Sequence, residues 1–276
     1  MSTSQDSSRS FFCQLEITTR CNFSCSYCAG RAMSRQDMTW ETFSAIIDRL
    51  SKRHPHCTVS LQGEGEPSLH PLFWRMVDYV VASGHTPYSI LNGSRVEAAR
   101  IASTFPRIGI SLDTLDADTA ERIGRHNLPK VLSNLEELVA AMGPARITVM
   151  SVDLGQPLAP LRAWVRERGF GRHVIQPLAS KDDYAKGYSS TIRVVALQQR
   201  PSVPGPSGCR FLERDLMRFY TWKGQELPCC FIKDTTGINS ISGLKQSLAC
   251  GDIPVGCSGC QELRSIAVSP KDTTGK

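Results

Sequence analysis

The stretch "CNFSCSYC", residues 21–28, places three cysteines within eight positions, with an aromatic residue just before the last of them. Cys21, Cys25 and Cys28 form the spacing CxxxCxxC, and the motif follows a short apolar run. A structural zinc site uses four protein ligands, commonly from paired CxxC elements. A 4Fe–4S cluster has four irons to ligate, so three cysteines would leave one iron open to an outside ligand. A zinc site completed by a distant Cys or His is the alternative interpretation of the same thiols.

Around this motif, short apolar runs alternate with amphipathic stretches over residues 11–178. Such alternation predicts a parallel sheet with right-handed crossovers. The chain is too short for a full eight-unit barrel with an extension, so we expect an α/β fold that is a partial (β/α)6 TIM-like barrel, with active groups at the carboxyl ends of the strands. The runs that predict strands are residues 11–17, 57–62, 86–92, 107–113, 146–152 and 172–178. The stretches that predict helices include residues 39–53, 71–84, 130–143 and 157–169.

The overall composition limits the class of protein. The 276 residues are 41% hydrophobic and carry a formal charge of +6. No apolar run reaches the roughly 18 residues that a membrane span needs, and no Lys/Arg block points to nucleic acid. Residues 1–10 are polar and lack the apolar core of a signal peptide, so we expect a disordered lead-in and a cytoplasmic protein. The eleven cysteines are then expected to be reduced thiols and metal ligands rather than disulfides.

The CxxxCxxC motif with Tyr27 before its last cysteine resembles the signature of the radical SAM enzymes. The resemblance covers about residues 11–178. It implies that Cys21, Cys25 and Cys28 hold a 4Fe–4S cluster whose open iron is chelated by S-adenosylmethionine (SAM). An electron from the reduced cluster splits the sulfonium, and the resulting 5′-deoxyadenosyl radical abstracts hydrogen from the substrate. An external electron donor such as flavodoxin or ferredoxin is the implied partner.

The same resemblance assigns cofactor contacts. The segment "EGEP", residues 64–67, resembles the family's GGEP motif with Glu64 in place of the first glycine. Glu66 would bind the ammonium of the methionyl group, Gly65 would let the backbone approach a ligand, and Tyr27 would pack near the adenine. Other expected contacts lie at the ends of strands or in the segment "IQPL": Asn92, Ser111, Asp113 and Gln176. Each could instead be an ordinary polar residue, because polar residues close many strands.

The composition changes after residue 178. Residues 179–208 are polar and then rich in Pro and Gly, which predicts a linker or a long functional loop. Residues 209–265 form a cysteine-rich region with little room for its own core, so we expect metal to hold it together, and residues 266–276 form a tail. The order of Cys209, Cys229, Cys257 and Cys260 resembles the twitch domain, a shortened SPASM extension that binds one auxiliary 4Fe–4S cluster. Soft thiolates suit zinc equally well.

The remaining cysteines bear on the chemistry. Cys13 and Cys57 are expected to be small core residues, and Cys230 could replace its neighbour Cys229 as a ligand. Cys250 could be a ligand, an inert thiol or a hydrogen donor. A thiol donor suits epimerisation, because an S–H bond is weaker than most C–H bonds. We therefore expect an epimerase of an aminoglycoside sugar carbon with Cys250 as the donor, similar to the neomycin-type aminoglycoside epimerases.

Other functions stay open at this point. One is oxidation of an aminocyclitol alcohol to a ketone, as in the deoxy-scyllo-inosamine dehydrogenases, which the chain resembles more loosely. Another is peptide modification, although no leader-binding domain is expected ahead of residue 11. Outside these are a non-enzymatic zinc or iron–sulfur scaffold and an RNA-modifying enzyme, which the modest charge disfavours. A polycationic substrate would need carboxylates around it, and the candidates are Glu64, Asp153, Asp182, Asp183 and Asp215.

Overall fold

The computed structural model describes residues 11–179, 181–192, 205–215 and 217–266. The lead-in expected at residues 1–10, the middle of the expected linker and the end of the tail lie outside these ranges. The first part of the chain alternates strands with helices, as the sequence predicts. Its strands are β1 (Phe12–Leu15), β2 (Thr58–Leu61), β3 (Thr86–Tyr88), β4 (Ile90–Leu91), β5 (Ile108–Ser111), β6 (Ile147–Asp153) and β7 (Arg172–Pro177). Its helices are α1 (Trp40–Arg53), α2 (Phe73–Ala82), α3 (Ala98–Thr104), α4 (Ala117–Ile123), α5 (Leu128–Met142) and α6 (Ala159–Glu167), with the 3₁₀ turns η1 (Pro67–Leu69) and η2 (Pro144–Arg146).

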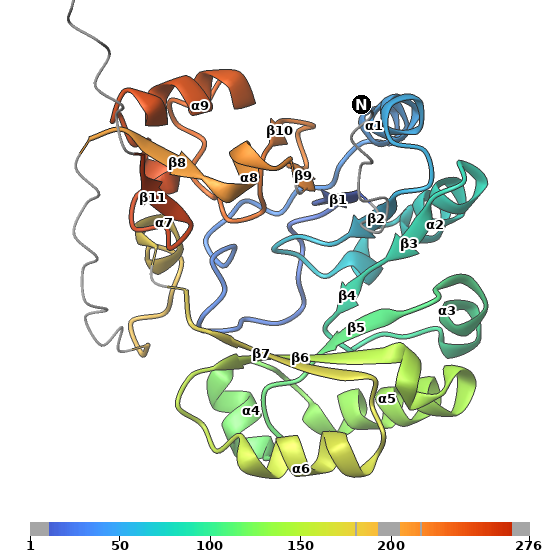
Figure 1. The fold of residues 1–276 in the computed structure, drawn as a ribbon. Coiled ribbons are helices and arrows are strands. Elements are labelled where there is room, and N and C mark those ends of the chain that lie inside the picture. Colours follow the sequence, from blue (N-terminus) through green and yellow to red (C-terminus); the bar gives the residue numbers. More distant parts are fainter. Residues whose placement is uncertain (1–10, 180, 193–204, 216, 267–276) are drawn as a thin grey trace, which may run out of the picture.

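The strands of this part form a curved parallel sheet in two sections, with the orders β1-β2-β3 and β4-β5-β6-β7. The junction between the sections is the buried Ser89, which separates β3 from β4. Its hydroxyl donates to the carbonyl of Leu61 (2.7 Å), and its own carbonyl accepts from the N–H of Gly109 (2.9 Å). Ser89 therefore links β2 to β5 across the break, and the six predicted runs form one open, barrel-like sheet (Figure 1).

The helices cover the outer face of this sheet (Figure 1). Helix α1 shows why: Phe43, Ile46, Ile47 and Leu50 recur at helical spacing, and all four are buried. Its N-cap is Thr39, whose hydroxyl accepts from the N–H of Thr42 (3.2 Å). The main apolar core lies between these helices and the sheet, and the buried Cys13 and Cys57 belong to it as small core residues, as expected.

The C-terminal part of the chain adds to the barrel sheet instead of folding apart from it. Strand β9 pairs in parallel with β1, from Phe12 opposite Met217 to Leu15 opposite Tyr220, and β10 pairs antiparallel with β9. Strands β8 and β11 form a second, antiparallel pair. The elements of this part are α7 (Asp182–Ala185), β8 (Ser207–Cys209), α8 (Arg210–Glu213), β9 (Met217–Tyr220), β10 (Glu226–Leu227), α9 (Ile241–Ala249), η3 (Val255–Cys257) and β11 (Leu263–Ser265).

The expectation that the C-terminal region has little room for a core of its own is wrong. A second apolar cluster joins β8, β9, β10 and α9, and it is separate from the barrel core. Its apolar residues are scattered over several short elements, so no long apolar run in the sequence indicates this core. The buried members are Cys209, Phe211, Met217, Phe219, Leu227, Cys229, Ile232, Ile238, Leu244, Leu248 and Cys257. Apolar burial therefore contributes to holding this region together.

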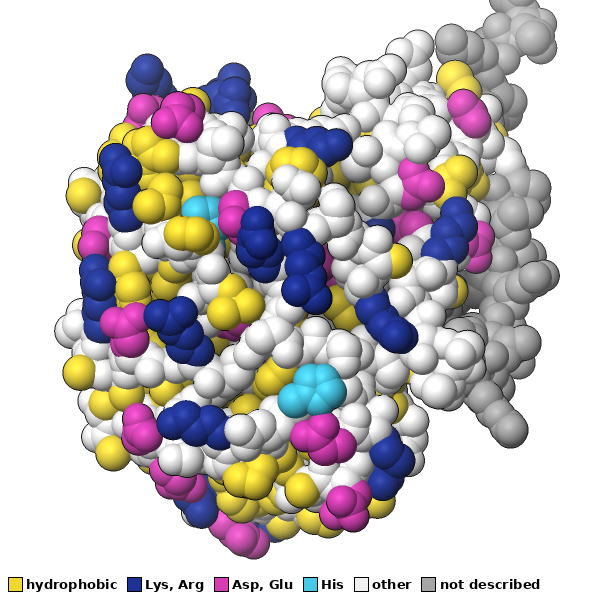
Figure 2. All heavy atoms as spheres, turned by 180° about the vertical axis from the view of Figure 1, so that it is seen from behind, with side chains coloured by type: hydrophobic (Ala, Val, Ile, Leu, Met, Phe, Trp, Pro, Cys, Tyr) yellow, Lys and Arg dark blue, Asp and Glu magenta, His cyan; other side chains and the backbone are white. Residues whose placement is uncertain are grey.

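Two surface properties agree with the composition. Within the described ranges, no helix has both the length and the apolar character needed to cross a membrane. On the face seen from behind, Lys and Arg side chains alternate with Asp and Glu side chains (Figure 2).

Candidate active site

The CxxxCxxC motif lies in a loop between β1 and α1, which we call the cysteine loop (residues 18–37). Its two ends meet in a β-bridge between Thr18 and Asp37, and the Thr18 hydroxyl donates to the Asp37 carboxylate (2.7 Å). Its middle is fixed to the end of α4, because the N–H groups of Ser24 and Ser26 donate to the carbonyls of Gly124 (3.0 Å) and Ile123 (2.7 Å). A loop with few regular elements is thus held at both its base and its tip.

The three thiols of the motif open onto one cavity at the carboxyl ends of the strands. Cys21, Cys25 and Cys28 all line this cavity, which has a volume of about 310 Å³ and which we call the central cavity. That volume falls in the range of cavities that hold cofactors. Burial raises the pKa of all three thiols, so they bind a metal only with release of a proton. The donor set fits a cluster that binds one iron through each thiolate.

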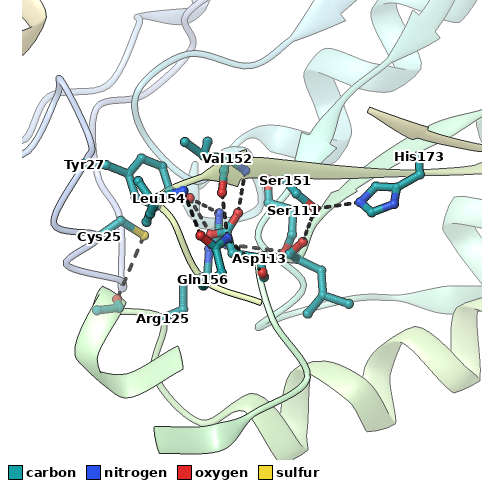
Figure 3. Close-up of polar contacts among 12 residues, drawn as sticks. Cys25, Tyr27, Ser111, Asp113, Arg125, Ser151, Val152, Leu154, Gln156 and His173 are labelled. Carbon is teal, nitrogen blue, oxygen red and sulfur yellow. Dashed lines mark hydrogen bonds and ion pairs between the residues drawn. The ribbon is translucent and has the colours of Figure 1, made fainter. Parts of the chain in front are cut away.

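The largely buried guanidinium of Arg125 lines the central cavity beside the cysteine loop. Arg125 Nε pairs with the Asp113 carboxylate, and its Nη2 donates to the Tyr27 hydroxyl (2.6 Å). The Tyr27 hydroxyl donates to Asp113 (2.7 Å), which also accepts from the N–H of Val152 (2.8 Å). The side chains of Tyr27, Asp113 and Arg125 point toward one another from the cysteine loop, the segment after β5 and the segment after α4 (Figure 3). Burial alone would lower the pKa of Arg125, but Asp113 and Tyr27 raise it, so the cavity is lined by a permanent cation.

Glu66 and Asn92 form a polar wall of the same cavity. Glu66 Oε1 accepts from the Ser68 hydroxyl (2.6 Å), and its Oε2 accepts from the N–H of Asn92 (2.6 Å). The Asn92 side chain donates to Asn22 in the cysteine loop (2.9 Å). Burial raises the pKa of Glu66, so a bound ammonium would favour its charged form. Glu66 is therefore held in place by the protein and presents a carboxylate suited to a cation.

Glu64, the residue that departs from the GGEP pattern, is paired across the molecule. Its carboxylate forms an ion pair with Lys233, which lies between β10 and α9. Its Oε2 also accepts from the N–H of Gly30 (3.0 Å) and contacts the Cys28 thiol (3.5 Å). Burial by itself would raise the pKa of Glu64, but Lys233 brings it below its usual value. Two distant segments of the chain thus meet beside the cysteine motif.

The other expected cofactor contacts divide into two groups. Gly65, Ser111 and Gln176 line the central cavity, as do Tyr27 and the polar wall. At Gly65 the reason for glycine is local, because a Cβ there would lie 2.4 Å from the Thr18 carbonyl oxygen. Asp113 is fully buried and bound by Arg125, so it supports Tyr27 and Arg125 and does not face a ribose.

Most carboxylates expected to bind a cationic substrate lie elsewhere. Glu64 lines the central cavity, but it is already paired. Asp183 is buried and pairs with Lys181 (3.3 Å), and Asp182 accepts from the Ser258 hydroxyl (3.2 Å). Asp215 is exposed and pairs with Arg218. The remaining candidate, Asp153, lines a second cavity of about 950 Å³ that shares Pro177 and Leu178 with the central cavity.

The C-terminal cysteines gather around a different and much smaller cavity. Cys209, Cys229, Cys257 and Cys260 all line it, and its volume is about 20 Å³. Burial raises the pKa of the Cys257 thiol to about 12, and its neighbours Cys260 and Cys209 add to this rise. Across the described residues, no three His, Cys, Asp or Glu side chains are grouped closely enough to hold a single metal ion. A 4Fe–4S cluster is larger than this cavity of about 20 Å³, so binding one here would require the cysteine side chains to rearrange.

Cys250, the expected hydrogen donor, and Cys230, expected as an alternative ligand, lie in contrasting places. Cys250 follows the end of α9, is exposed, and does not line the central cavity. This placement is a correction to the expectation that Cys250 faces the substrate. Cys230 does not line the central cavity either, but it is partly buried, and its carbonyl accepts from Lys233 Nζ (2.8 Å). It therefore lies next to the ion pair that borders the cysteine motif.

The family follows from a comparison of the whole chain with known proteins. Residues 15–166, more than half of the chain, match the model of the Radical SAM superfamily. The chain belongs to the radical SAM superfamily. The matched range contains the cysteine loop, the polar wall and Arg125, so the superfamily's 4Fe–4S cluster and SAM are expected at the central cavity.

Individual relatives are similar over part of their length. An S-adenosylmethionine-dependent nucleotide dehydratase of Selenomonas ruminantium is 31% identical over 125 residues, which are 43% of this chain and 45% of that protein. The mycofactocin maturase MftC of Mycobacterium ulcerans is 29% identical over 198 residues, 69% of this chain and 47% of that one. This radical SAM protein thus spans about half the length of these relatives. Its fold is similar to that of Streptococcus suis SuiB bound to S-adenosylmethionine, with a TM-score of 0.63 at 13% identity over 84% of this chain and 62% of that chain.

Three residues at or beside the central cavity carry no recognisable signal in the sequence. Arg125 follows the left-handed C-cap Gly124 of α4 and carries no motif. Tyr184 lines the central cavity from α7, inside the segment expected to be a linker. Lys233 lies far from Glu64 in the sequence, and only the fold brings the two together.

Proposed function

We propose that this radical SAM protein removes a hydrogen atom from a carbon of its substrate and returns one from the Cys230 thiol to the opposite face, so that the product is an epimer. Membership of the superfamily supports the radical step. The observation that carries the epimerase part is the position of Cys230 beside the Glu64–Lys233 pair at the border of the central cavity.

Contacts on two sides support this position for Cys230. Lys233 Nζ binds its carbonyl and pairs with Glu64, which lines the cavity. Burial, Glu64 and Cys230 together raise the pKa of Tyr184, a phenol that lines the same cavity. Cys230 therefore lies near two lining residues, whereas the exposed Cys250 has no contact of this kind with the cavity residues in the structure's described ranges.

Each turnover of the proposed reaction consumes two electrons and one proton. When bound, the cluster and SAM would supply, at the expense of one electron, a 5′-deoxyadenosyl radical able to take a hydrogen atom from the substrate carbon. The S–H bond of Cys230 breaks, its hydrogen forms the new C–H bond, and a sulfur radical remains. One electron and one proton return this sulfur to the thiol. Both electrons come from a low-potential one-electron protein reductant of the flavodoxin or ferredoxin class.

Residues of the central cavity suit SAM as a ligand. Cys21, Cys25 and Cys28 would hold the cluster. The Arg125 guanidinium is a permanent cation suited to the methionyl carboxylate, and Glu66 is an anion suited to the methionyl ammonium. Tyr27, Ser111 and Gln176 line the rest of the cavity and would contact the adenosyl group.

We also propose that Cys209, Cys229, Cys257 and Cys260 hold an auxiliary 4Fe–4S cluster in a twitch-like region. The support is that all four thiols line one cavity, although they are far apart in the sequence. In a 4Fe–4S cluster each of these thiolates would bind its own iron, and zinc on the same four thiols is the alternative.

The charges around the cavity narrow the class of substrate. Glu64 is paired with Lys233, and the central cavity also holds Arg125. Cations thus offset the carboxylates, which favours a substrate recognised by hydrogen bonds and apolar contacts over one held by unpaired carboxylates. An aminoglycoside substrate rests on the resemblance of the sequence alone.

The test is an assay in deuterated water with the reconstituted enzyme, SAM, a reductant and a panel of aminoglycosides and aminocyclitols. We expect an epimer that carries one deuterium at the inverted carbon, because solvent labels an S–H group. Cys230→Ala should cleave SAM but form little or no epimer, and Cys250→Ala, its matched control, should act like the wild type. A ketone two mass units below the substrate would instead indicate oxidation. Epimer formation by Cys230→Ala would refute the assigned donor.

A second candidate function is peptide modification. It is favoured by the second cavity of about 950 Å³, which adjoins the central cavity at Pro177 and Leu178. The fold is also similar to that of Streptococcus suis SuiB bound to precursor peptide SuiA, with a TM-score of 0.60 at 12% identity. Short peptides in the same assay test this candidate, and a mass change on a peptide alone would favour it.

A further inference from the structure

The ion pair between Glu64 and Lys233 connects the cysteine loop to the segment that carries Cys230. Both partners are largely buried, with side-chain exposures of 15% for Glu64 and 11% for Lys233. Buried charges of this kind are stable only when paired, so neither residue can lose its partner without a large effect on its surroundings. Removing one partner of this pair should therefore destabilise the protein strongly, whereas removing one partner of an exposed ion pair has little effect on stability.

On one side, the pair reaches the cluster-binding motif itself. Glu64 Oε2 accepts from the N–H of Gly30 (3.0 Å) and contacts the Cys28 thiol (3.5 Å). Gly30 leaves the space for this side chain, since a Cβ there would lie 2.2 Å from Glu64 Cβ. When Cys28 gives up its proton to bind iron, the Glu64 carboxylate becomes a negative neighbour of a thiolate. Lys233 offsets that repulsion.

On the other side, the pair reaches the proposed hydrogen donor. Lys233 Nζ donates to the carbonyl of Cys230 (2.8 Å) while it pairs with Glu64. A continuous series of contacts thus runs from Cys28 through Glu64 and Lys233 to Cys230. The separation between the cluster ligand and the donor residue is set by this series.

We infer that Glu64 and Lys233 are positioning residues that fix Cys230 relative to the cysteine loop and that, as a matched pair of charges, set the reduction potential of the SAM-binding cluster. The inference rests on the proposed function, because it takes Cys28 as a ligand and Cys230 as the donor. Reduction adds negative charge to a cluster, so an unpaired anion beside Cys28 lowers the potential and an unpaired cation raises it.

The chain offers a control for purely mechanical effects. Lys181 also holds the segment around Cys230: its Nζ donates to the carbonyl of Gly256 (2.6 Å) and to that of Phe231, and it pairs with Asp183. Asp183 in turn accepts from the N–H of Lys233 (2.8 Å). Among the contacts of the described residues, this second pair has none with the cysteine loop. Its loss should loosen the segment without placing a charge beside Cys28.

The experiment compares Lys233→Met, Glu64→Gln, Lys233→Arg and Lys181→Met as reconstituted full-length proteins. The first measurement is the midpoint potential of the cluster whose EPR signal changes when SAM is added, in the absence of substrate. We expect a lower potential for Lys233→Met, a higher one for Glu64→Gln, and values near the wild type for Lys233→Arg and Lys181→Met. A structural role alone would not move the two single variants in opposite directions.

The second measurement is the ratio of 5′-deoxyadenosine to epimer. Lys233→Met should raise it by roughly ten- to a hundredfold, because a misplaced donor slows hydrogen return and not SAM cleavage. Shifts of the potential in the same direction for Glu64→Gln and Lys233→Met, or no shifts, would overturn the inference. If Lys233→Met fails to load iron, the neutral double variant Glu64→Gln/Lys233→Met decides, since its potential should lie near the wild type. A wild type with the cluster but without epimer would refute the proposed function and leave the potential test intact.

Discussion

The two groups of cysteines in this radical SAM protein differ in what surrounds their thiols. Cys21, Cys25 and Cys28 open onto a cavity of about 310 Å³ that also presents Arg125 and Glu66. The C-terminal cysteines enclose a cavity of about 20 Å³ whose other walls are mostly apolar side chains such as Leu244 and Leu248. Three thiols beside charged groups leave room for a ligand to join, whereas four thiols in an apolar setting close their site against one.

This difference suggests a division of labour. Catalytic metal sites keep an open position, and structural or electron-storing sites are saturated by protein ligands. The cysteine loop has few regular elements and is tied to α4 by backbone hydrogen bonds, while the C-terminal thiols lie on or next to short strands and turns around an apolar cluster. The first group of thiols thus lies in an open cavity beside charged groups, and the second lies in a small cavity with mostly apolar walls.

The largest expected effect is the loss of the open site. Replacing Cys21, Cys25 and Cys28 together with Ala should abolish 5′-deoxyadenosine formation, because no thiolates remain to hold the SAM-binding cluster. The C-terminal iron should stay. Chromatography of the reaction and iron analysis of the protein check both points, and any remaining SAM cleavage would contradict the division between the sites.

The next effect concerns the closed site. The intact protein should carry about eight irons from two clusters of four, and Cys209→Ala/Cys257→Ala should reduce the count to about four. SAM cleavage should persist in this variant, because the central cavity is untouched. Iron and zinc analysis of both proteins is the measurement. About four irons and one zinc in the wild type would remove the C-terminal half of the comparison.

A smaller effect is expected where the open site is supported by buried charge. Asp113→Asn leaves Arg125 without its partner, and breaking a buried ion pair costs about 3–5 kcal/mol of the free energy of unfolding. Asp78→Asn is the control, since Asp78 and Arg100 form an exposed pair worth about 1 kcal/mol or less. Urea unfolding of both variants measures the two losses. Equal losses of the free energy of unfolding would mean that the buried Asp113–Arg125 pair stabilises the protein no more than the exposed pair does.

The smallest effect is a dependence of stability on pH that belongs to the barrel alone, since all six histidines lie between residues 54 and 173. His70 is buried, its Nδ1 accepts from the N–H of Leu72 (3.0 Å), and its Nε2 donates to the Met38 carbonyl (3.0 Å). Burial lowers the pKa of His70. Below about pH 6.5, His70 is protonated in the unfolded chain but stays neutral in the native protein. The free energy of unfolding therefore decreases as the pH is lowered.

The measurement is the free energy of unfolding of the wild type and His70→Gln from pH 7.5 to 5.5. The wild type should lose up to about 1.4 kcal/mol more per pH unit than the variant, which is the energy of one pKa unit. Parallel curves for the two proteins would show that His70 does not contribute.

The sequence predicted the barrel because its signals are local. Alternating apolar runs define the strands, and α5 ends at Met142 just before Gly143, as expected. The helix begins earlier than predicted, at Leu128, because Asn127 caps it and Pro129 is tolerated in the first turn. The CxxxCxxC motif placed the central cavity in the same way, since its three thiols are neighbours in the chain.

What the sequence could not predict depends on contacts between distant segments. The Glu64–Lys233 pair forms only when the C-terminal part packs against the cysteine loop. The burial of Asp183 and the exposure of Cys250 follow from the same packing. Residue type alone therefore could not show that Cys250 is exposed or that most of the candidate carboxylates are already paired.

The parallel pairing of β1 with β9 has a consequence for synthesis of the chain. β1 is synthesised about 200 residues before one of its two neighbours, β9, which begins only at Met217. Until then, the edge of β1 presents unpaired N–H and C=O groups that another nascent chain could bind. A contact between sequence-distant strands also forms slowly, since a long loop must close first. We therefore expect fragments released before Met217 to aggregate, and the completed chain to gain its protected edge in one late step.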